Sequence, residues 1–388
     1  MANTLTSLIP TMYESLDIVS RELVGGINAV NRNSEATQAA VGQVVMSPVA
    51  PAVQTYNIVP GQLPPDDGDQ TIGNVQITIA KSKYAPIRWT GEEQLGLRRG
   101  GQTQNIVRDQ FTQAIRALVN EIEVDVWAAA RAAASRAYGT PGTAPFGTAG
   151  DFSDFGQIWK ILVDNGAPQS DLHLVLGSTA MANLRGKQSG LFKVNEAGND
   201  DLLRRGIVQM IEGFALHTSA APKTVVAGTV TSAPTVGAHA IGTTALTIST
   251  GAGGAVAIKA GDAVTIAGDT NKYVAQADLT VGASSSGTLT IGNPGLRIAT
   301  SGNPAITVGT IATANIALQR GALTLATRVP AMPEGGDDAD DVIELTDPVS
   351  GLTFQVAMYR LYRRVKYEVG LAWGVGAAKQ EFIAQLLG

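Results

Sequence analysis

The sequence predicts an α+β fold, in which one long helix supports a β-rich body and a separate β unit is inserted into that body. Three observations lead to this prediction. Residues 102–138 repeat apolar side chains at steps of three and four, which is typical of a helix. Strand-like alternation occurs before and after them, and residues 222–318 differ in composition from their neighbours. Only 16% of the 388 residues are charged and 44 are glycine, which favours β-rich architecture over a charged helical bundle.

The overall composition limits the classes of function. A formal net charge of −5 gives no support for affinity toward nucleic acid. The chain has no cysteine, which excludes disulfide bonds and thiolate chemistry and suits a reducing cytoplasm. The first residues lack the basic and apolar regions of a signal peptide, and no run of about 18 apolar residues predicts a membrane span. We therefore expect no membrane partner.

Residues 1–45 are predicted to form an N-terminal arm. An amphipathic helical segment over residues 7–24 is broken by Gly25 and Gly26, and a polar tract follows at 31–38. Two interpretations stay open. The segment is either a flexible terminus or an arm that becomes ordered against a neighbouring chain.

Residues 46–97 are predicted to form an extended loop built as a β hairpin. A Pro- and Gly-rich stretch precedes alternating strand sequence, in which Val75, Ile77 and Ile79 share one face. No core partner for this face is evident nearby in the sequence. We expect it to be covered either by a neighbouring subunit or by the fold's own body.

Residues 98–150 are predicted to form a peripheral domain around the long helix. At 1.5 Å per residue, about 36 residues would span roughly 54 Å, which suits a helix crossing a flat, extended subunit. A coiled coil is less favoured, because the second half of the helix turns to alanine and no second heptad run occurs. Gly139 and Pro141 are expected to end the helix. The apolar stripe comprises Val107, Phe111, Ile115, Leu118, Ile122, Val126, Ala129 and Ala133.

Residues 151–221 and 319–388 are predicted to form one mixed body in two parts. The expected elements of the first part are a helix over 152–165 with Phe155, Ile158, Trp159 and Leu162 inward, a buried strand over 172–176, a helix capped by Ser178, and a strand or hairpin over 207–216. Those of the second part are a strand over 322–332, an acidic turn at 335–345, and strand sequence from Phe354 through Tyr367 and Val369 to a tail that ends at Gly388.

Residues 222–318 are predicted to form a small antiparallel barrel or sandwich. By count this stretch holds seven charged residues and no tryptophan, and short alternating runs of β-branched residues are separated by turn residues. Disorder is the competing interpretation, but the β-branched alternation disfavours it. Because the mixed pattern resumes afterwards, the unit is an insertion and not a tandem domain.

Catalytic and metal-binding patterns are absent from the sequence. His173, His217 and His239 lie in separate segments, so each is expected to be a structural or surface residue. The acidic turns at 66–69 and 337–341 lack the EF-hand ligand order, and no nucleophile elbow or Walker loop occurs. We therefore expect no enzyme, no cofactor and no metal site.

The order of these parts resembles the major capsid proteins of tailed bacteriophages with the HK97-like fold. Those proteins combine an N-terminal arm, an extended β loop, a long spine helix and an axial α/β domain. Among them the chain is most similar to podophage coat proteins with a small antiparallel β-barrel inserted in the axial domain. The stretches that carry the resemblance are KAGDAVTIAG at 259–268, GQVVMSPV at 42–49, NEIEV at 120–124 and LAWGV at 371–375. One departure is that residues 231–244 carry no charged side chain, where such coats often have a long charged loop.

The resemblance implies a function in self-assembly. Copies of the chain would form hexamers and pentamers of an icosahedral shell in the virion, assembled in the bacterial host cytoplasm as a procapsid that expands on maturation. The implied partners are a scaffolding protein, a portal protein and packaged double-stranded DNA without sequence-specific contacts. Lys81 and Lys83 are the lysines on the extended loop that covalent crosslinking, known in part of the family, could use. The candidate self-assembly residues are Val75, Ile77, Ile79, Lys81, Lys83, Arg98 and Arg99.

Two other readings of the sequence stay open. A phage tail protein or another β-rich virion protein could share the Gly- and Thr-rich β unit, but it would form trimers or tubes. An enzyme that uses the acidic turns is disfavoured by the lack of converging His, Cys or carboxylate motifs.

Overall fold

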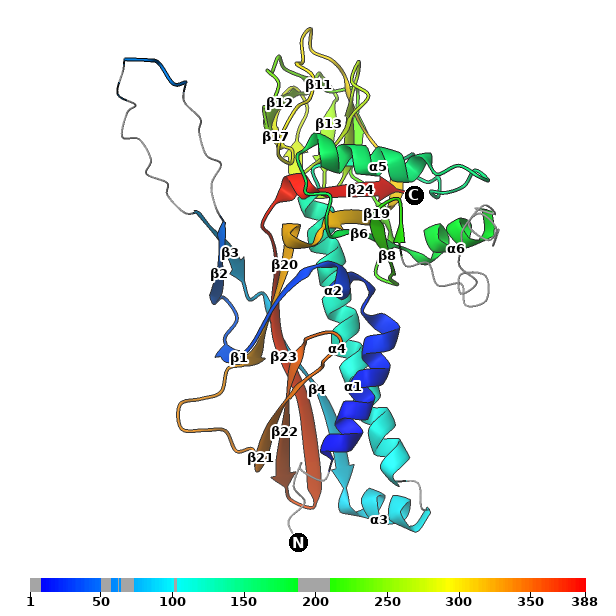
Figure 1. Ribbon diagram of the computed structural model, residues 1–388, viewed down its shortest axis with the longest axis vertical. Helices are drawn as coiled ribbons and strands as arrows, with labels where there is room; N and C mark the ends of the chain where they lie inside the picture. Colours follow the sequence, from blue (N-terminus) through cyan, green and yellow to red (C-terminus); the bar gives the residue numbers. More distant parts are fainter. Residues whose placement is uncertain (1–7, 50–56, 62, 64–72, 101–102, 188–209) are drawn as a thin grey trace.

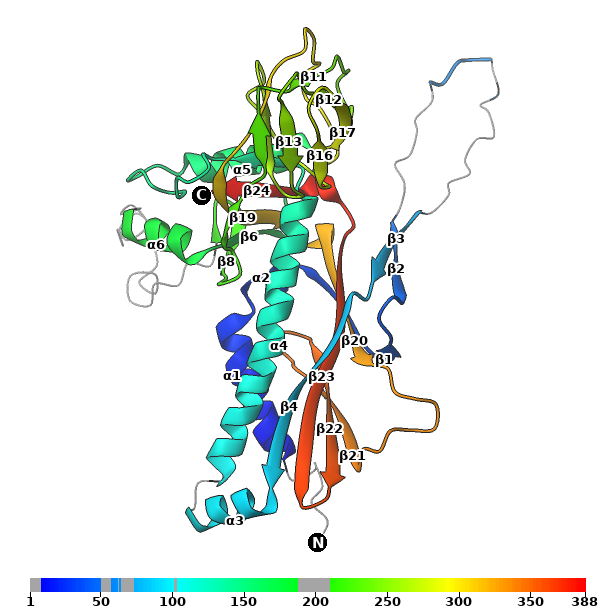
Figure 2. The ribbon, with the colours of Figure 1, turned by 180° about the vertical axis from the view of Figure 1, so that it is seen from behind.

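The computed structural model describes the chain except residues 1–7, 50–56, 62, 64–72, 101–102 and 188–209. Helix α4 (Thr103–Ala133) lies along the long axis of the molecule and runs from one end most of the way toward the other (Figures 1 and 2). The 31 residues of α4 correspond to roughly 46 Å at 1.5 Å per residue. The predicted apolar stripe faces the core: Phe111, Ile115, Leu118, Ile122 and Val126 are buried.

The end of the long helix differs from the prediction. Helix α4 stops at Ala133, and β5 (Arg136–Tyr138) follows as a strand. Strand β5 pairs with β15 (Lys272–Val274) on one side and β24 (Ile383–Leu387) on the other. Backbone partners from distant parts of the chain therefore outweigh the local helical preference of the alanine-rich sequence.

A six-stranded sheet lies along the same axis as α4 and packs against it (Figure 2). Five strands follow the order β1-β20-β23-β22-β21, and β4 pairs with the other edge of β23. The strands are β1 (Asn31–Ala39), β4 (Lys81–Thr90), β20 (Leu323–Pro330), β21 (Asp341–Thr346), β22 (Thr353–Leu361) and β23 (Arg364–Ala377). Side chains of α4, of helix α1 (Ile9–Leu23) and of this sheet form the largest hydrophobic core.

The N-terminal segment is ordered on its own chain. Helix α1 packs along α4, the short helix α2 (Gly25–Ala29) follows it, and β1 pairs in parallel with β20. The interpretation as a flexible terminus is therefore wrong for residues 9–39, which are ordered without a neighbouring chain, and contact of this arm with a neighbour stays a prediction. Met12, Leu16 and Val19 supply the apolar face that holds α1 in place.

A ten-stranded sheet crosses the other end of the molecule. Its order is β18-β14-β15-β5-β24-β19-β6-β8-β7, with β9 also paired to β19. The strands not yet given are β6 (Leu172–Leu176), β7 (Met210–Ile211), β8 (Phe214–Thr218), β9 (Thr224–Val226), β14 (Ala263–Ile266), β18 (Ile306–Val308) and β19 (Ile311–Gln319). Helices α5 (Ser153–Asp164) and α6 (Ser178–Lys187) pack on one face around Phe155 and Phe214.

Two details of this part correct the sequence analysis. Trp159 on α5 is 37% exposed, so it does not point inward with Phe155, Ile158 and Leu162. The predicted C-terminal tail is also wrong, because β24 is a fully buried strand paired between β5 and β19. The short run before Gly388 gives no local sign of the partners that bury it. Of the stretch at 207–216, the described residues form the predicted hairpin, β7 and β8, and residues 207–209 lie outside the description.

The compositionally distinct stretch forms β structure around its own core. Two three-stranded antiparallel sheets, β10-β13-β16 and β11-β12-β17, enclose a cluster that includes Leu246, Val256 and Tyr273. Their strands are β10 (Thr229–Thr231), β11 (Thr235–Val236), β12 (Ala245–Ser249), β13 (Ala255–Ile258), β16 (Leu279–Val281) and β17 (Ser286–Thr290). Strands β14, β15 and β18 of the same stretch join the ten-stranded sheet. Strand β19 is a central strand of that sheet.

A two-stranded ribbon projects sideways from the molecule (Figures 1 and 2). It consists of β2 (Val44–Val49) and β3 (Gly73–Thr78), paired in antiparallel register. Helix α3 (Gly91–Gly100) and the 3-10 turns η3 (Arg320–Ala322) and η4 (Gln380–Phe382) complete the described elements. The polar turn at 64–69, in the middle of the predicted extended loop, lies outside the described residues.

Candidate assembly surfaces

The β2–β3 ribbon has two different faces. Cross-strand register pairs Val45 with Ile77, and this face packs on Ala326 and Ala372 of the six-stranded sheet. The opposite face carries Val44 and Met46, which pair with Thr78 and Gln76, and Met46 is 59% exposed. The exposed apolar face with Val44 and Met46 is therefore a candidate contact surface.

The predicted apolar interface residues lie on the covered face. Ile77 and Ile79 are buried within their own chain, and Val75 packs half-buried against the same cluster. Of the two alternatives in the sequence, cover by the fold's own body is therefore confirmed for Ile77 and Ile79. Both side chains are almost fully covered within the single chain, and their candidate role in self-assembly stays a prediction. Sequence reasoning missed Met46, although GQVVMSPV alternates just as β3 does.

Lys81 and Lys83 face the spine helix of their own chain. Lys81 Nζ lies 2.9 Å from carboxylate oxygens of both Glu121 and Asp125, and Lys83 Nζ lies 2.6 Å from Glu121. Trp373 Nε1 donates to the second oxygen of Asp125 at 2.8 Å. Hydrogen bonding to Glu121 raises the pKa of Lys81, and hydrogen bonds from Lys81 and Lys83 lower the pKa of Glu121. The network fixes the base of the ribbon to α4.

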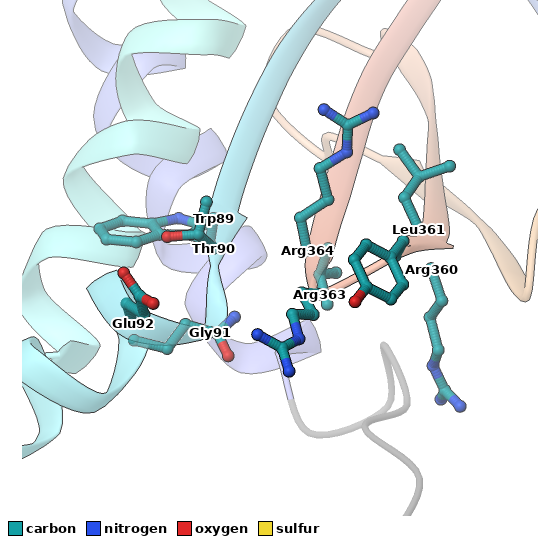
Figure 3. Close-up of a pocket in the computed structure, with 11 residues that line it drawn as sticks. Trp89, Thr90, Gly91, Glu92, Arg360, Leu361, Arg363 and Arg364 are labelled. Atoms are coloured by element: carbon teal, nitrogen blue, oxygen red, sulfur yellow. The ribbon is translucent and has the colours of Figure 1, made fainter.

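A second exposed surface lies at the opposite end of the molecule from the inserted β unit. The turn between β22 and β23 presents Tyr362, which is 87% exposed, beside half-exposed Leu361. This turn lines a cleft of about 640 Å³. Figure 3 shows Arg360, Arg363 and Arg364 projecting from the turn in different directions. We call residues 360–364 the arginine turn. An aromatic ring among arginines is the composition that protein interfaces favour.

The acidic turn lies next to the arginine turn. Tyr359 Oη donates to the Asp337 carboxylate, and Arg360 N donates to Asp340 Oδ2 at 2.7 Å. Burial and the bond to Asp337 raise the pKa of Tyr359. One end of the molecule therefore carries an acidic and a basic surface side by side, which the sequence separation of about 20 residues did not reveal.

The other predicted residues contribute less to a site. Arg98 and Arg99 lie on α3, but their side chains are outside the described part of the chain. Among the described residues, no group of three His, Asp or Glu side chains could hold a metal ion, and no helix is long and apolar enough to cross a membrane.

A buried carboxylate and a pair of histidines were not anticipated. Glu123 on α4 is buried, and its carboxylate accepts hydrogen bonds from the backbone N–H groups of Gly26 and Ile27 and from Ser219 Oγ. Burial raises the pKa of Glu123 despite these bonds. His173 and His217, expected to be unrelated, form a direct hydrogen bond.

Comparison with known proteins finds similarity in structure only. No family model matches the chain, and no curated protein matches it. Among solved structures, the chain is similar to one from the capsid of the cyanophage P-SCSP1u, with 10% identity, 92% of this chain and 86% of that chain covered, and a TM-score of 0.47. A chain of Gordonia phage Cozz has 12% identity, with 93% of this chain and 85% of that chain covered, and a TM-score of 0.45. A chain from the capsid of Ralstonia phage GP4 has 10% identity, with 94% of this chain and 88% of that chain covered, and a TM-score of 0.42. At these values the similarity does not fix what this chain does.

Proposed function

We propose that this chain is the major capsid protein of a tailed bacteriophage, and that its copies assemble into a closed icosahedral shell. The observation that carries the proposal is the β2–β3 ribbon, which projects from the body of the molecule and leaves Val44 and Met46 exposed. One face of the ribbon already packs on the six-stranded sheet, so the face with Val44 and Met46 is the apolar area that a further surface would cover. The resemblance of the sequence to phage coat proteins makes a second copy the natural partner.

The parts of the chain correspond to those of an HK97-like capsid protein. In this proposal residues 1–45 are the arm, 46–97 the extended loop, 98–150 the peripheral domain with its spine helix, and 151–221 with 319–388 the axial and remaining peripheral parts. Residues 222–318 are the inserted barrel domain, of which β9, β14, β15, β18 and most of β19 (Ile311–Gln319) pair into the ten-stranded sheet.

The arginine turn provides a second contact between copies. Acidic and basic surfaces side by side on one projecting end favour a head-to-tail arrangement, in which the arginine turn of one copy faces the acidic turn of the next. Repeated head-to-tail contacts close into rings when the rotation permits. Each contact is modest, and the shell is stable through their number.

The partners follow from this function. A scaffolding protein directs a procapsid that later expands, a portal protein occupies one vertex, and double-stranded DNA is confined without base-specific reading. The net charge of −5 is consistent with confinement and not with tight DNA binding. Crosslinking through Lys81 or Lys83 is not part of the proposal, since Glu121 and Asp125 engage both amines.

The substitution Met46→Glu tests the ribbon contact. The side chain points away from its own body, so the unassembled chain should keep its thermal stability while particles are lost in sedimentation velocity. Met210→Glu is the matched control, because Met210 is 69% exposed on β7 at another surface. Particles from Met46→Glu at the yield of the unaltered chain would contradict the proposal.

A further inference from the structure

Two histidines from separate segments meet on one face of the ten-stranded sheet. His173 Nδ1 lies 2.9 Å from His217 Nε2, and the rings stack with centroids 5.1 Å apart. His173 is 3% exposed. The pair joins the adjacent parallel strands β6 and β8 through their side chains, in addition to the backbone ladder.

The sheet register shows on which face of the sheet the pair lies. His173 is level with Leu318 of β19, and His217 is level with Val175, which is level with Ile316. Leu318 and Ile316 belong to the core that also contains Ile27 of α2, and α2 packs on β6 and β8. The histidines therefore lie on the α2 side of the sheet, opposite the face covered by α5 and α6.

The contact restricts how many protons the pair can hold. An N–H···N bond needs one donor and one neutral acceptor, so the contact survives with one charge at most. A second proton would place two cations at hydrogen-bond distance. The nearby charged groups are Asp171, whose Oδ1 lies 3.6 Å from His173 Nε2, Arg320, which pairs with Asp171 at 3.8 Å, and Glu123, which holds α2 from α4.

Burial disfavours protonation of even one of the two histidines. Desolvation lowers the pKa of both residues, and the neighbouring His173 and Arg320 help to lower the pKa of His217 to about 4. An unfolded histidine binds its proton near pH 6.5, so the unfolded chain holds more protons between about pH 6.5 and pH 4. The free energy of unfolding of this region therefore decreases as the pH falls from about 6.5 to about 4.

We propose that the His173–His217 pair is a proton-sensitive latch, which holds α2 and the N-terminal segment against the β6–β8 sheet and releases them on acidification. The neutral pair keeps the strands and α2 in register. Protonation separates the two rings and disrupts the surface on which α2 packs. The latch belongs to the single chain, so it holds whether or not the chain assembles into shells.

Imidazole NMR combined with hydrogen exchange of the full, unassembled chain tests the latch. The chain has three histidines, so each can be followed, and His239 on the inserted unit serves as the internal reference. We expect His217 to titrate near pH 4. We also expect the protection of the α2 amides, corrected for the intrinsic exchange rate, to fall at least about tenfold between pH 6.5 and pH 4.

Three variants identify the group responsible. In His217→Gln the protection of α2 should lose its pH dependence, whereas His239→Gln should behave as the unaltered chain. Glu123→Gln should keep the pH-dependent step, because the step originates in the histidines. If His217→Gln does not fold, His173→Gln replaces it. An ordinary titration of His217 near pH 6.5, or an unchanged step in the variant that folds, would overturn the proposal. Loss of the step in Glu123→Gln alone would also overturn it and would assign the effect to Glu123.

Discussion

Arg131 Nη2 lies 2.8 Å from Asp262 Oδ1, although the two residues are 131 positions apart in the sequence. Asp262 belongs to the KAGDAVTIAG stretch at 259–268. Its second carboxylate oxygen, Oδ2, accepts hydrogen bonds from the backbone N–H groups of Gly228 and Lys259. Arg131 stands on the last turn of α4. One buried ion pair thus fixes this part of residues 222–318 to the last turn of α4.

The substitution Asp262→Asn should destabilise the chain by about 3–5 kcal/mol, because it leaves the guanidinium of Arg131 mostly buried without its partner charge. Chemical denaturation of the unassembled chain measures this. Asp17→Asn removes an exposed ion pair with Arg21 and should change stability by less than about 1 kcal/mol. Equal effects of the two substitutions would show that the Arg131–Asp262 pair does not hold the unit.

The substitution Trp127→Ala should destabilise the chain by about 3–5 kcal/mol. The ring is buried in the main core, and its Nε1 donates to the carbonyl of Ala314 at 2.8 Å. Trp159→Ala is the matched control, since that ring is 37% exposed, and its effect should be smaller. Thermal unfolding of both variants gives the comparison, and an unchanged midpoint for Trp127→Ala would place its ring outside the core.

The substitution Gly374→Ala should disrupt the crossing of β23 and β3. A Cβ atom at this position would lie 2.0 Å from the backbone oxygen of Thr78, which cannot move without displacing the ribbon. Gly156→Ala on α5 meets no atom within 4 Å and should stabilise its helix by up to about 1 kcal/mol. Circular dichroism during heating measures both effects. A stable Gly374→Ala chain would show that the ribbon is not packed so closely.

Reversing charge on the arginine turn should prevent assembly without unfolding the chain. The double substitution Arg363→Glu and Arg364→Glu changes side chains at an exposed turn, so the thermal midpoint should stay within a few degrees. Particle yield in sedimentation should fall at least about tenfold. Arg21→Glu, which alters an exposed arginine on α1, should assemble normally. Normal particles from the double variant would remove this turn from the interface.

Elements that depend on local pattern were predictable from the sequence. The strand at 172–176 and the helices at 9–23 and 153–164 carry their own periodicity, and they appear within one or two residues of the expected positions. The end of α4 and the strand β24 were not predictable, because each is set by strands from other parts of the chain. The local alternation of apolar and polar residues does not show which distant strand a given strand will pair with.

The candidate surfaces were less predictable than the fold. Alternation in 75–79 identified an apolar face but not what covers it, and the side that stays open is carried by Met46 on the partner strand. The His173–His217 contact depends on the parallel pairing of β6 and β8, for which neither residue gives a local signal. A cluster that forms across strands becomes visible only when the topology is known.

The most direct test of the proposed function is negative-stain electron microscopy of the purified full chain, alone and with the scaffolding protein that this function implies. A capsid protein should form closed shells of uniform diameter in at least one of these conditions. Tubes or spirals alone would support self-assembly and show that a further partner controls curvature. Monomers or small closed oligomers under both conditions would contradict the proposed function.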